Sequence, residues 1–357
     1  MKVCIVSKTN IFLCPFIKKY LTICKTLNKI DLIYWNRHRI DENLLDKFNR
    51  VYCFELSMNE HENKISKLLN FYRFKCYCQK ILTEKKYDKI IFLHNIIPII
   101  MCTYLAKNYK GRYLIDIRDY TYEYNRLFFK LEEKAIQNSG LAVISSIGYK
   151  EFLPKHDYIL CHNDPQIDKL TIEKIRKNQW NKTKPIQISF IGLVRFYEQN
   201  KKLLNFFKND KRFLLAYYGQ NSEYLKKYAH KNRIENTKFK GRFDPSETIS
   251  FYENTVVINN FYGNNTPTLD YALSNKLYYA ATFYKPILVC KNTYMEKISK
   301  KYSFGICLED SNDVNDFYEK ILSIDRNKLK QGCSKFMEIV KSDNEIFDSK
   351  ISEFIWS

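Results

Sequence analysis

The sequence has 357 residues, which is enough for two domains of ordinary size. Of these residues, 45% are hydrophobic and 27% are charged, and this composition excludes a disordered chain. The 59 Lys and Arg residues against 39 Asp and Glu residues give a net charge of +20, which suits anionic partners such as nucleotides, acidic lipids or nucleic acid. The eleven cysteines include no C-x-x-C pair or zinc-ligand spacing, which indicates free thiols in a reducing compartment and no metal site.

The first residues lead directly into Val3–Val6, an apolar run that is typical of a first strand rather than of a signal peptide. The longest apolar run lies near residue 96, contains Pro98 and is too short to span a bilayer. We therefore expect a cytoplasmic protein, with peripheral contact to the inner face of the cell membrane as an open alternative.

Strand-like apolar runs alternate with helical stretches in the first half of the chain. The expected strands are Val3–Ser7, Asp31–Trp35, Val51–Leu56, Lys89–His94, Tyr113–Ile117 and Leu141–Ser145. The expected helices are Phe12–Leu27, Glu60–Lys85 and Tyr122–Asn138. This alternation predicts a parallel sheet with helices on both faces.

The second half repeats the same plan. Its expected strands are Ile186–Ile191, Phe213–Tyr218, Thr237–Phe239, Val256–Asn259, Ile287–Val289 and Gly305–Leu308. Its expected helices are Lys201–Lys208, Ser222–Lys231, Pro245–Glu253, Asp270–Thr282 and Asn312–Ser323. We therefore expect an α/β protein with two Rossmann-like domains, residues 1–162 and 163–342, joined within Cys161–Lys184 by a linker that includes one helix.

Ligands of such sheets bind beyond the carboxyl ends of the strands. No glycine precedes Gly111, so the first strand is not followed by the glycine fingerprint of dinucleotide-binding enzymes, which argues against hydride transfer. The stretch Asp270–Val289 predicts a helix followed by a buried strand, and the polar residues 264–268 before it would point free backbone N–H groups at an anion.

Within this stretch, residues 275–280 (NKLYYA) and 284–288 (YKPIL) resemble the "NKLYEYLAAGKPVI" segment of bacterial nucleotide-sugar glycosyltransferases with the two-domain B-type fold, similar to the family 4 enzymes. The resemblance implies two domains facing a cleft, with this helix lining the donor site. It also implies that the C-terminal helix, residues 343–357, crosses back to the first domain. The donor-binding residues implied here are Thr268, Asp270, Asn275, Lys276 and Tyr279.

Residues at the ends of further strands resemble other motifs of the same family. Gly192 and Arg195, followed by Lys201 or Lys202, resemble a "G-x-x-R…K" element whose cations hold the donor diphosphate; solvated side chains are the alternative. Tyr218 precedes a turn that resembles the one near the nucleotide base, and Gly241 lies in an "F-x-G" turn.

In the first domain, the resemblance implies catalytic roles for His94, Asp116 and Asp119. A histidine after the fourth strand touches the transferred sugar in similar enzymes, although it could equally be held by the backbone. Asp116 and Asp119 belong to a "D-x-R-D" stretch that could act on an acceptor hydroxyl, or Asp119 could simply pair with Arg118.

These features predict transfer of a sugar from a UDP- or GDP-linked donor to a glycan or polyprenyl-linked acceptor in capsular or other surface polysaccharide synthesis. The resemblance implies retention of the anomeric configuration, no metal and no cofactor beyond the nucleotide-sugar substrate. Two family glutamates are replaced by Tyr271 and Tyr279, so a catalytically silent scaffold or carbohydrate-binding protein is the alternative. Nucleic-acid binding ranks last, because the basic residues are dispersed and no known motif appears.

The stretch Lys64–Lys86 interleaves basic residues with aromatic and aliphatic ones. Such a helix could lie on anionic lipid, because each cation near a membrane surface contributes about 1 kcal/mol. The alternative is a long domain helix with a solvated face.

Overall fold

The computed structural model describes residues 1–24, 30–42, 44–58, 62–178 and 184–357. The chain forms two compact units, of which the N-terminal unit contains Met1–His162 and Ser342–Ser357, and the C-terminal unit contains Asn163–Lys341. Each unit has one sheet, and all neighbouring strands are parallel, so the predicted α/β class with two Rossmann-like halves is confirmed. Across these described ranges, we find no helix with the length and apolarity that a membrane span requires.

The N-terminal sheet has seven strands in the order β3-β2-β1-β4-β5-β6-β7. Their bounds are β1 Val3–Ser7, β2 Ile30–Asn36, β3 Arg50–Glu55, β4 Lys89–Phe92, β5 Tyr113–Ile117, β6 Leu141–Ile144 and β7 Ile159–Leu160. Every residue of β1, β2, β4 and β5 is buried, as expected for central strands that are covered on both faces. The strand order reverses between β1 and β4, which makes the carboxyl ends of these strands the switch point of the sheet.

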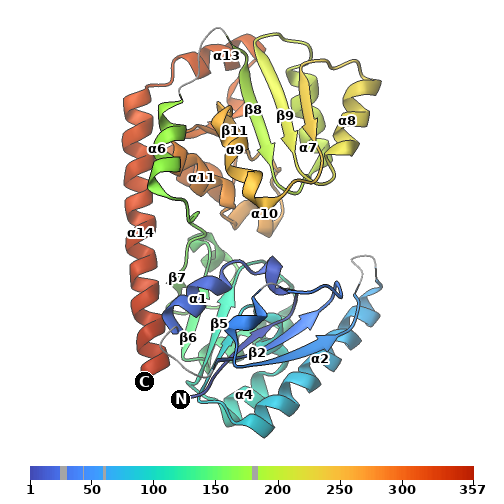
Figure 1. Ribbon diagram of the computed structural model, residues 1–357, viewed down its shortest axis with the longest axis vertical. Helices are drawn as coiled ribbons and strands as arrows, with labels where there is room; N and C mark the ends of the chain where they lie inside the picture. Colours follow the sequence, from blue (N-terminus) through green and yellow to red (C-terminus); the bar gives the residue numbers. More distant parts are fainter. Residues whose placement is uncertain (25–29, 43, 59–61, 179–183) are drawn as a thin grey trace. The chain divides into compact units, whose positions relative to one another are not determined.

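Helices flank this sheet (Figure 1). They are α1 Ile17–Ile23, α2 Lys64–Lys85, α3 Ile96–Ile100, α4 Cys102–Asn108 and α5 Arg126–Gln137, with short 3-10 turns at Ile11–Leu13, Leu45–Lys47 and Ile147–Glu151.

The C-terminal sheet has six strands in the order β10-β9-β8-β11-β12-β13, with its switch point between β8 and β11. Their bounds are β8 Ile186–Ile191, β9 Phe213–Tyr218, β10 Thr237–Lys240, β11 Val257–Asn259, β12 Ile287–Val289 and β13 Gly305–Cys307. The helices of this unit are α6 Lys169–Lys177, α7 Tyr197–Phe206, α8 Ser222–Lys231, α9 Thr248–Glu253, α10 Pro267–Tyr271, α11 Asn275–Phe283, α12 Tyr294–Lys301 and α13 Val314–Leu322, with 3-10 turns at Pro245–Glu247 and Leu308–Asp310.

Successive strand residues of this unit belong to two different apolar cores, because side chains alternate across a strand. Leu215 and Tyr217 of β9 pack with residues of α7, α8 and α13, whereas Ala216 and Tyr218 pack with residues of α6, α9, α11 and α12. The sheet is therefore buried on both faces, which leaves the loops at the strand ends to carry exposed polar groups.

The last helix, α14 Arg326–Trp356, contributes to the cores of both units. Phe336 and Val340 pack in the C-terminal unit, whereas Phe347, Ile351 and Phe354 pack in the N-terminal unit.

Three predicted helices differ clearly in extent from the observed ones. The C-terminal helix, expected at residues 343–357, already begins at Arg326. Asp270–Thr282 forms two helices, because Ala272 has extended backbone (φ −76°, ψ 149°) and the Ser274 hydroxyl starts a new helix by accepting the Lys276 N–H. Phe12–Leu27 is also divided, since a 3-10 turn and α1 lie on either side of Pro15, and residues 25–29 lie outside the described ranges. Glu60 and residues 179–183 of the predicted linker lie outside them too. Four short elements, α3, α4, α12 and β7, were not expected from the sequence, because each spans too few residues for a clear hydrophobic period.

We predict that Phe347→Ala lowers the stability of the N-terminal unit by about 3–5 kcal/mol, the usual cost of removing a buried phenylalanine ring. Phe347 is 0% exposed and packs edge-on against Tyr20, with ring centroids 5.5 Å apart. Urea unfolding followed by circular dichroism measures the effect. Ile346→Ala is the matched control, because Ile346 is 52% exposed and its removal should change stability by less than about 0.5 kcal/mol.

Candidate functional site

The candidate site lies in the C-terminal unit, at the carboxyl ends of the two strands that form the switch point. The loop after β8 contains Gly192 and Arg195, and the loop after β11 contains Asn260 and Tyr262. Helix α11 then begins after Ser274, whose hydroxyl donates to the Asn260 side-chain carbonyl at 2.7 Å. This hydrogen bond fixes the start of α11 to the end of β11.

Gly192 provides an open stretch of backbone at this edge. Its φ of +120° favours glycine, and a Cβ atom there would meet nothing within 4 Å. Its N–H donates to the Tyr218 carbonyl at 2.9 Å, and a Cβ on the adjacent Gly219 would lie 1.8 Å from the Gly192 oxygen. Gly219 therefore permits the close approach of the two loops, and Gly192 leaves room for a ligand.

Lys276 is the most unusual residue of the site, because its ammonium group is buried without a carboxylate. Only 6% of the residue is exposed, its Nζ donates to the Tyr262 hydroxyl at 2.5 Å, and the same atom lies 3.8 Å from the Phe190 ring centroid. Among the described residues, Lys276 forms no ion pair. Burial, and then the positive charge of Arg195, lower the pKa of Lys276 from 10.5 to about 7.

Arg195 is exposed, and its charge acts on both Lys276 and Tyr262. Burial raises the pKa of Tyr262, and Arg195 partly opposes that rise. The backbone of Arg195 is held by Asn200, a fully buried residue whose amide donates to the Arg195 carbonyl at 3.0 Å. Asn259 at the end of β11 in turn donates to the Asn200 side-chain oxygen at 3.1 Å. The backbone of Arg195 is therefore tied to the end of β11 by a buried amide network.

Lys201 lies on α7, beyond the loop that contains Gly192 and Arg195. Its ammonium group lies 2.6 Å from Glu198 and 5.3 Å from the Tyr228 ring centroid, in a groove of about 300 Å³ between α7 and α8. The alternative residue, Lys202, acts electrostatically on the Cys290 thiol, which accepts the Gly263 N–H at 3.1 Å beside Tyr262. Lys201 and Lys202, the two alternatives expected from the sequence, both lie on α7 and stay candidates for the second cation of this element.

Tyr218 is a core residue, which corrects the expectation of a side chain in a donor site. It is 3% exposed, it stacks on Phe251 with ring centroids 4.3 Å apart, and its hydroxyl accepts from Gln187 at 3.3 Å. Its backbone alone borders the Gly192 loop. Gly241 lies at the end of β10, where a Cβ would come within 2.5 Å of a flexible Glu223 oxygen.

The remaining predicted donor residues lie on α10 and α11. Asp270 accepts the Asn265 N–H at 2.8 Å, and this hydrogen bond closes the polar loop before α10. Thr268, in the first turn of α10, is exposed. Asn275 is exposed in the first turn of α11. Tyr279 is half-buried and stacks on Tyr252 with ring centroids 4.7 Å apart, and burial raises its pKa.

Asp116 of the N-terminal unit is a buried structural carboxylate, contrary to the expected role on an acceptor hydroxyl. It is 0% exposed, and Arg118 donates to both of its oxygens, at 2.7 and 2.8 Å. Tyr20 donates a third hydrogen bond at 2.7 Å. Arg118 therefore pairs with Asp116, whereas Asp119 is exposed at the end of the loop and acts electrostatically on Lys8.

His94 follows β4 and is held as a neutral imidazole. Its Nδ1 is buried without a hydrogen-bond partner, and its Nε2 lies 3.8 Å from the Cys14 sulfur. Burial, together with the charges of Lys8, Arg37 and Arg118, lowers its pKa well below the ordinary value. Throughout the part of the chain that the structure describes, no group of three or more His, Cys, Asp or Glu side chains could hold a metal ion.

No family model and no curated protein sequence matches this chain. Solved structures do match. Anabaena Alr3699/HepE in complex with UDP is similar with a TM-score of 0.66 and 11% identity over 99% of this chain and 100% of that chain. Sucrose-phosphate synthase from Thermosynechococcus elongatus has a TM-score of 0.68 and 9% identity over 99% and 98% of the two chains.

The lipopolysaccharide outer core galactosyltransferase WaaB in its apo form has a TM-score of 0.65 and 14% identity over 100% of this chain and 99% of that chain. At such identities the likeness shows the fold alone. The chain therefore has the B-type glycosyltransferase fold, with one parallel-sheet Rossmann-like unit in each half.

Proposed function

We propose that this protein is a glycosyltransferase that moves a sugar from a UDP- or GDP-linked donor to a glycan or polyprenyl-linked acceptor. The observation that carries this proposal is the pair of cations, Arg195 and Lys276, at the switch point beside the open backbone of Gly192. HepE, which has the same fold, was solved with UDP, with UDP and glucose, and with UDP-glucose. Capsular or other surface polysaccharide synthesis is the pathway that we propose from the sequence resemblance.

The two cations suit the chemistry of a diphosphate leaving group. When the bond between the anomeric carbon and the diphosphate oxygen breaks, negative charge grows on the diphosphate, and fixed positive charges stabilise that change. Arg195 can donate two hydrogen bonds to one phosphate, and Lys276 supplies a compact charge with a buried aromatic lining. We propose that this pair carries the charge stabilisation without a divalent cation, and that transfer retains the anomeric configuration, as the family resemblance implies.

Sugar binding without transfer is a second candidate function, and one observation favours it. Tyr279 stands where the family resemblance places a glutamate, and it stacks on Tyr252 instead of offering a carboxylate. A phenol presents one hydroxyl where a carboxylate accepts two or more hydrogen bonds, so the ribose would be held more weakly. Release of UDP or GDP from donor sugars in the presence of acceptor glycans distinguishes the two functions.

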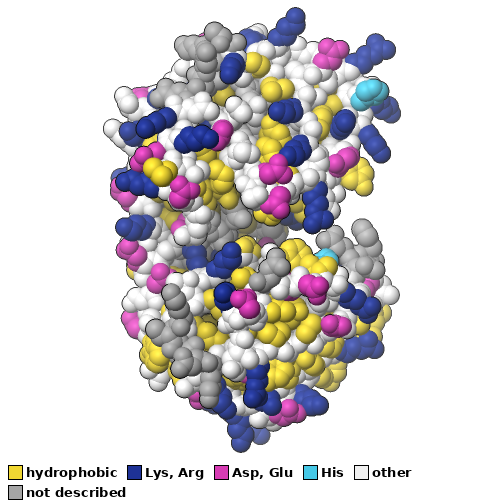
Figure 2. Space-filling view, viewed as in Figure 1, with side chains coloured by type: hydrophobic (Ala, Val, Ile, Leu, Met, Phe, Trp, Pro, Cys, Tyr) yellow, Lys and Arg dark blue, Asp and Glu magenta, His cyan; other side chains and the backbone are white. Residues whose placement is uncertain are grey.

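We also propose peripheral contact with anionic membrane through helix α2. Ile65, Leu68, Leu69 and Tyr72 form an outward apolar stripe at helical spacing and are 54–73% exposed. Figure 2 shows hydrophobic side chains gathered on the visible face of the N-terminal unit, with Lys and Arg side chains nearby.

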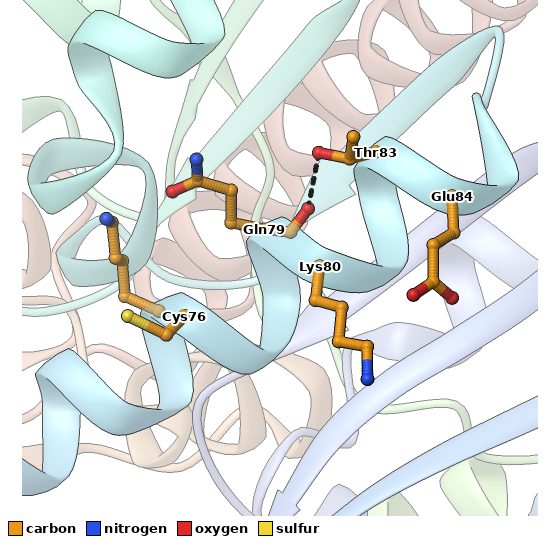
Figure 3. A pocket seen from close by; sticks show the side chains of 6 residues that line it. Cys76, Gln79, Lys80, Thr83 and Glu84 are labelled. Atoms are coloured by element: carbon orange, nitrogen blue, oxygen red, sulfur yellow. Dashed lines mark hydrogen bonds between the residues drawn. The ribbon is translucent and has the colours of Figure 1, made fainter.

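The basic residues of α2 continue this stripe. Arg73 is exposed, and Lys75 lies 5.3 Å from the Tyr72 ring centroid. One turn further, Lys80 and Glu84 extend to the same side of α2 beside a shallow hollow of about 480 Å³ (Figure 3). An apolar stripe bordered by cations is the pattern of a helix that lies in the headgroup region of an anionic bilayer.

We predict that Arg195→Ala weakens UDP or GDP binding by about 1.5–3 kcal/mol, the range for a hydrogen bond to a charged group. Isothermal titration in buffer with EDTA measures the affinity and tests at the same time whether binding needs a metal. Lys107→Ala is the matched control, because Lys107 is an exposed cation of the N-terminal unit and its removal should leave the affinity unchanged. Equal affinities for wild type and Arg195→Ala, or binding that requires added manganese, would contradict this phosphate site.

We predict that UDP affinity falls as the pH rises above about 7 and that Lys276→Met removes this dependence. Free Lys276 has a pKa of about 7, and a bound diphosphate raises it, so binding above that pH takes up a proton. The affinity should fall by at most about tenfold per pH unit in this window. Titrations at pH 7.5, 8 and 8.5, where the terminal phosphate of UDP is almost fully ionised, measure it. A parallel decline in Lys276→Met would assign the effect to another group.

We predict that the protein co-sediments with vesicles rich in phosphatidylglycerol and that Leu68→Asp reduces the bound fraction about tenfold. Burying an exposed leucine in lipid contributes about 1.5–3 kcal/mol, which the aspartate would remove. Leu170→Asp is the control, since Leu170 is 79% exposed on α6 of the other unit. Identical sedimentation of the two variants would exclude α2 as the contact, and equal binding to phosphatidylcholine vesicles would exclude a preference for anionic lipid.

A further inference from the structure

We infer that Lys8, Arg37 and His94 form a second anion site in the N-terminal unit, which takes a phosphate or carboxylate group of the acceptor. That the bound anion belongs to the acceptor rests on the proposed function, whereas the anion site itself rests on the structure alone. No part of the donor site contributes to it, because all three residues belong to the N-terminal unit.

The topology brings the three residues to one edge. Strands β2, β1 and β4 are neighbours in the sheet, in that order. Arg37 directly follows β2, Lys8 directly follows β1, and His94 comes two residues after β4. In a parallel sheet these carboxyl ends lie side by side, and the reversal of strand order between β1 and β4 is where such sheets bind ligands.

Arg37 is a positioned guanidinium without an anion. Its Nε and Nη2 atoms are buried and have no hydrogen-bond partner. Its central carbon lies 4.2 Å from the Trp35 ring centroid and 5.1 Å from that of Phe71, so the guanidinium is held against two aromatic rings. Trp35 is itself fixed by a hydrogen bond of 2.7 Å from its indole N–H to the Leu56 carbonyl. Buried donors of this kind are almost always satisfied in proteins, which indicates a missing partner.

Lys8 adds a second cation, and His94 adds a neutral hydrogen-bonding group. Neither Lys8 nor Arg37 forms an ion pair within the described ranges. Burial lowers the pKa of Lys8 to about 8, Asp119 opposes that change, and Arg37 adds to it, which places these charges near one another. The positive charges of Lys8 and Arg37 both lower the pKa of His94, and its buried Nδ1 has no hydrogen-bond partner.

Two of the carboxylates near this edge, Glu42 and Asp116, are engaged elsewhere, whereas Asp119 and Glu123 both act electrostatically on Lys8. Glu42 accepts the N–H groups of Ile11 and Phe12 at 2.7 and 3.0 Å, and Asp116 is held by Arg118. Glu123 accepts from the Thr121 N–H at 2.6 Å, and burial raises its pKa. The remaining positive charge suits an oxyanion, since a guanidinium fork and an ammonium group together match both phosphate and carboxylate.

The test uses a protein in which the donor site is disabled, Arg195→Ala with Lys276→Met, so that anions bound there do not contribute. Inorganic phosphate, glucuronate and uncharged glucose are titrated against it. We expect binding of phosphate, of glucuronate or of both, and none of glucose. Phosphate alone would indicate a lipid-linked phosphate as the source, and glucuronate alone an acidic sugar. Binding of neither anion would overturn the proposal.

Arg37→Met in the same background should weaken anion binding at least about tenfold, whereas Arg39→Gln, on an exposed neighbour in the same loop, should not. Removing an unpaired buried cation should also raise the Tm without anion and abolish the gain in Tm that the anion gives. A lower Tm with unchanged anion affinity would show that Arg37 is structural and would overturn the site. UDP binding by the otherwise wild-type protein reports separately on the proposed function.

Discussion

A parallel strand must be followed by a crossover that returns the chain to the same starting edge, and this requirement applies to every strand of both sheets. Most of the crossovers contain an α-helix, those from β2 to β3 and from β6 to β7 contain a 3-10 turn, and the helices bury both faces of each sheet. Polar side chains with a chemical role can therefore gather only at the strand ends. The cations of each unit, Arg195 with Lys276 and Lys8 with Arg37, follow from this constraint, because each pair lies just beyond the carboxyl ends or on the helix that starts there.

The energetic feature shared by the two edges is a cation that is removed from water without a carboxylate. The difference between an ordinary pKa of 10.5 and about 7 corresponds to a cost on the order of 5 kcal/mol for charging Lys276 in the folded protein. Such a cost persists only when a ligand offsets it or when the group stays neutral. An anion at the site would restore the charge of Lys276 and so couple binding to proton uptake.

Aromatic rings hold these cations in place. The Lys276 ammonium lies over Phe190, and Tyr262 stacks on Phe196 with ring centroids 4.7 Å apart. The Arg37 guanidinium lies over Trp35 in the same way. Aromatic faces attract cations while leaving the N–H donors free, so a charge can be fixed in position and still be available to an incoming anion. Aromatic residues make up 16% of the chain, and some of them therefore have a local role at both edges.

The sequence by itself determined the elements and the class of fold. Alternating apolar runs located twelve of the strands within one or two residues, because a buried parallel strand needs a continuous apolar segment. The sequence also placed Gly192, Arg195 and Lys276 at strand and helix ends. Their position along the chain was enough to predict that they lie at the edge of the sheet where ligands bind.

Tertiary structure decided what each of those side chains contacts. Position in sequence could not reveal that Tyr218 points into the core against Phe251, that Asp116 is held by Arg118 and Tyr20, or that Lys201 faces Glu198. Nor could it bring Lys8, Arg37 and His94 together, since they are far apart in the chain and meet only because β2, β1 and β4 are neighbours. Local patterns fix the backbone of a strand or helix, whereas burial and pairing depend on residues that are distant in sequence, and only the folded sheet places those residues side by side.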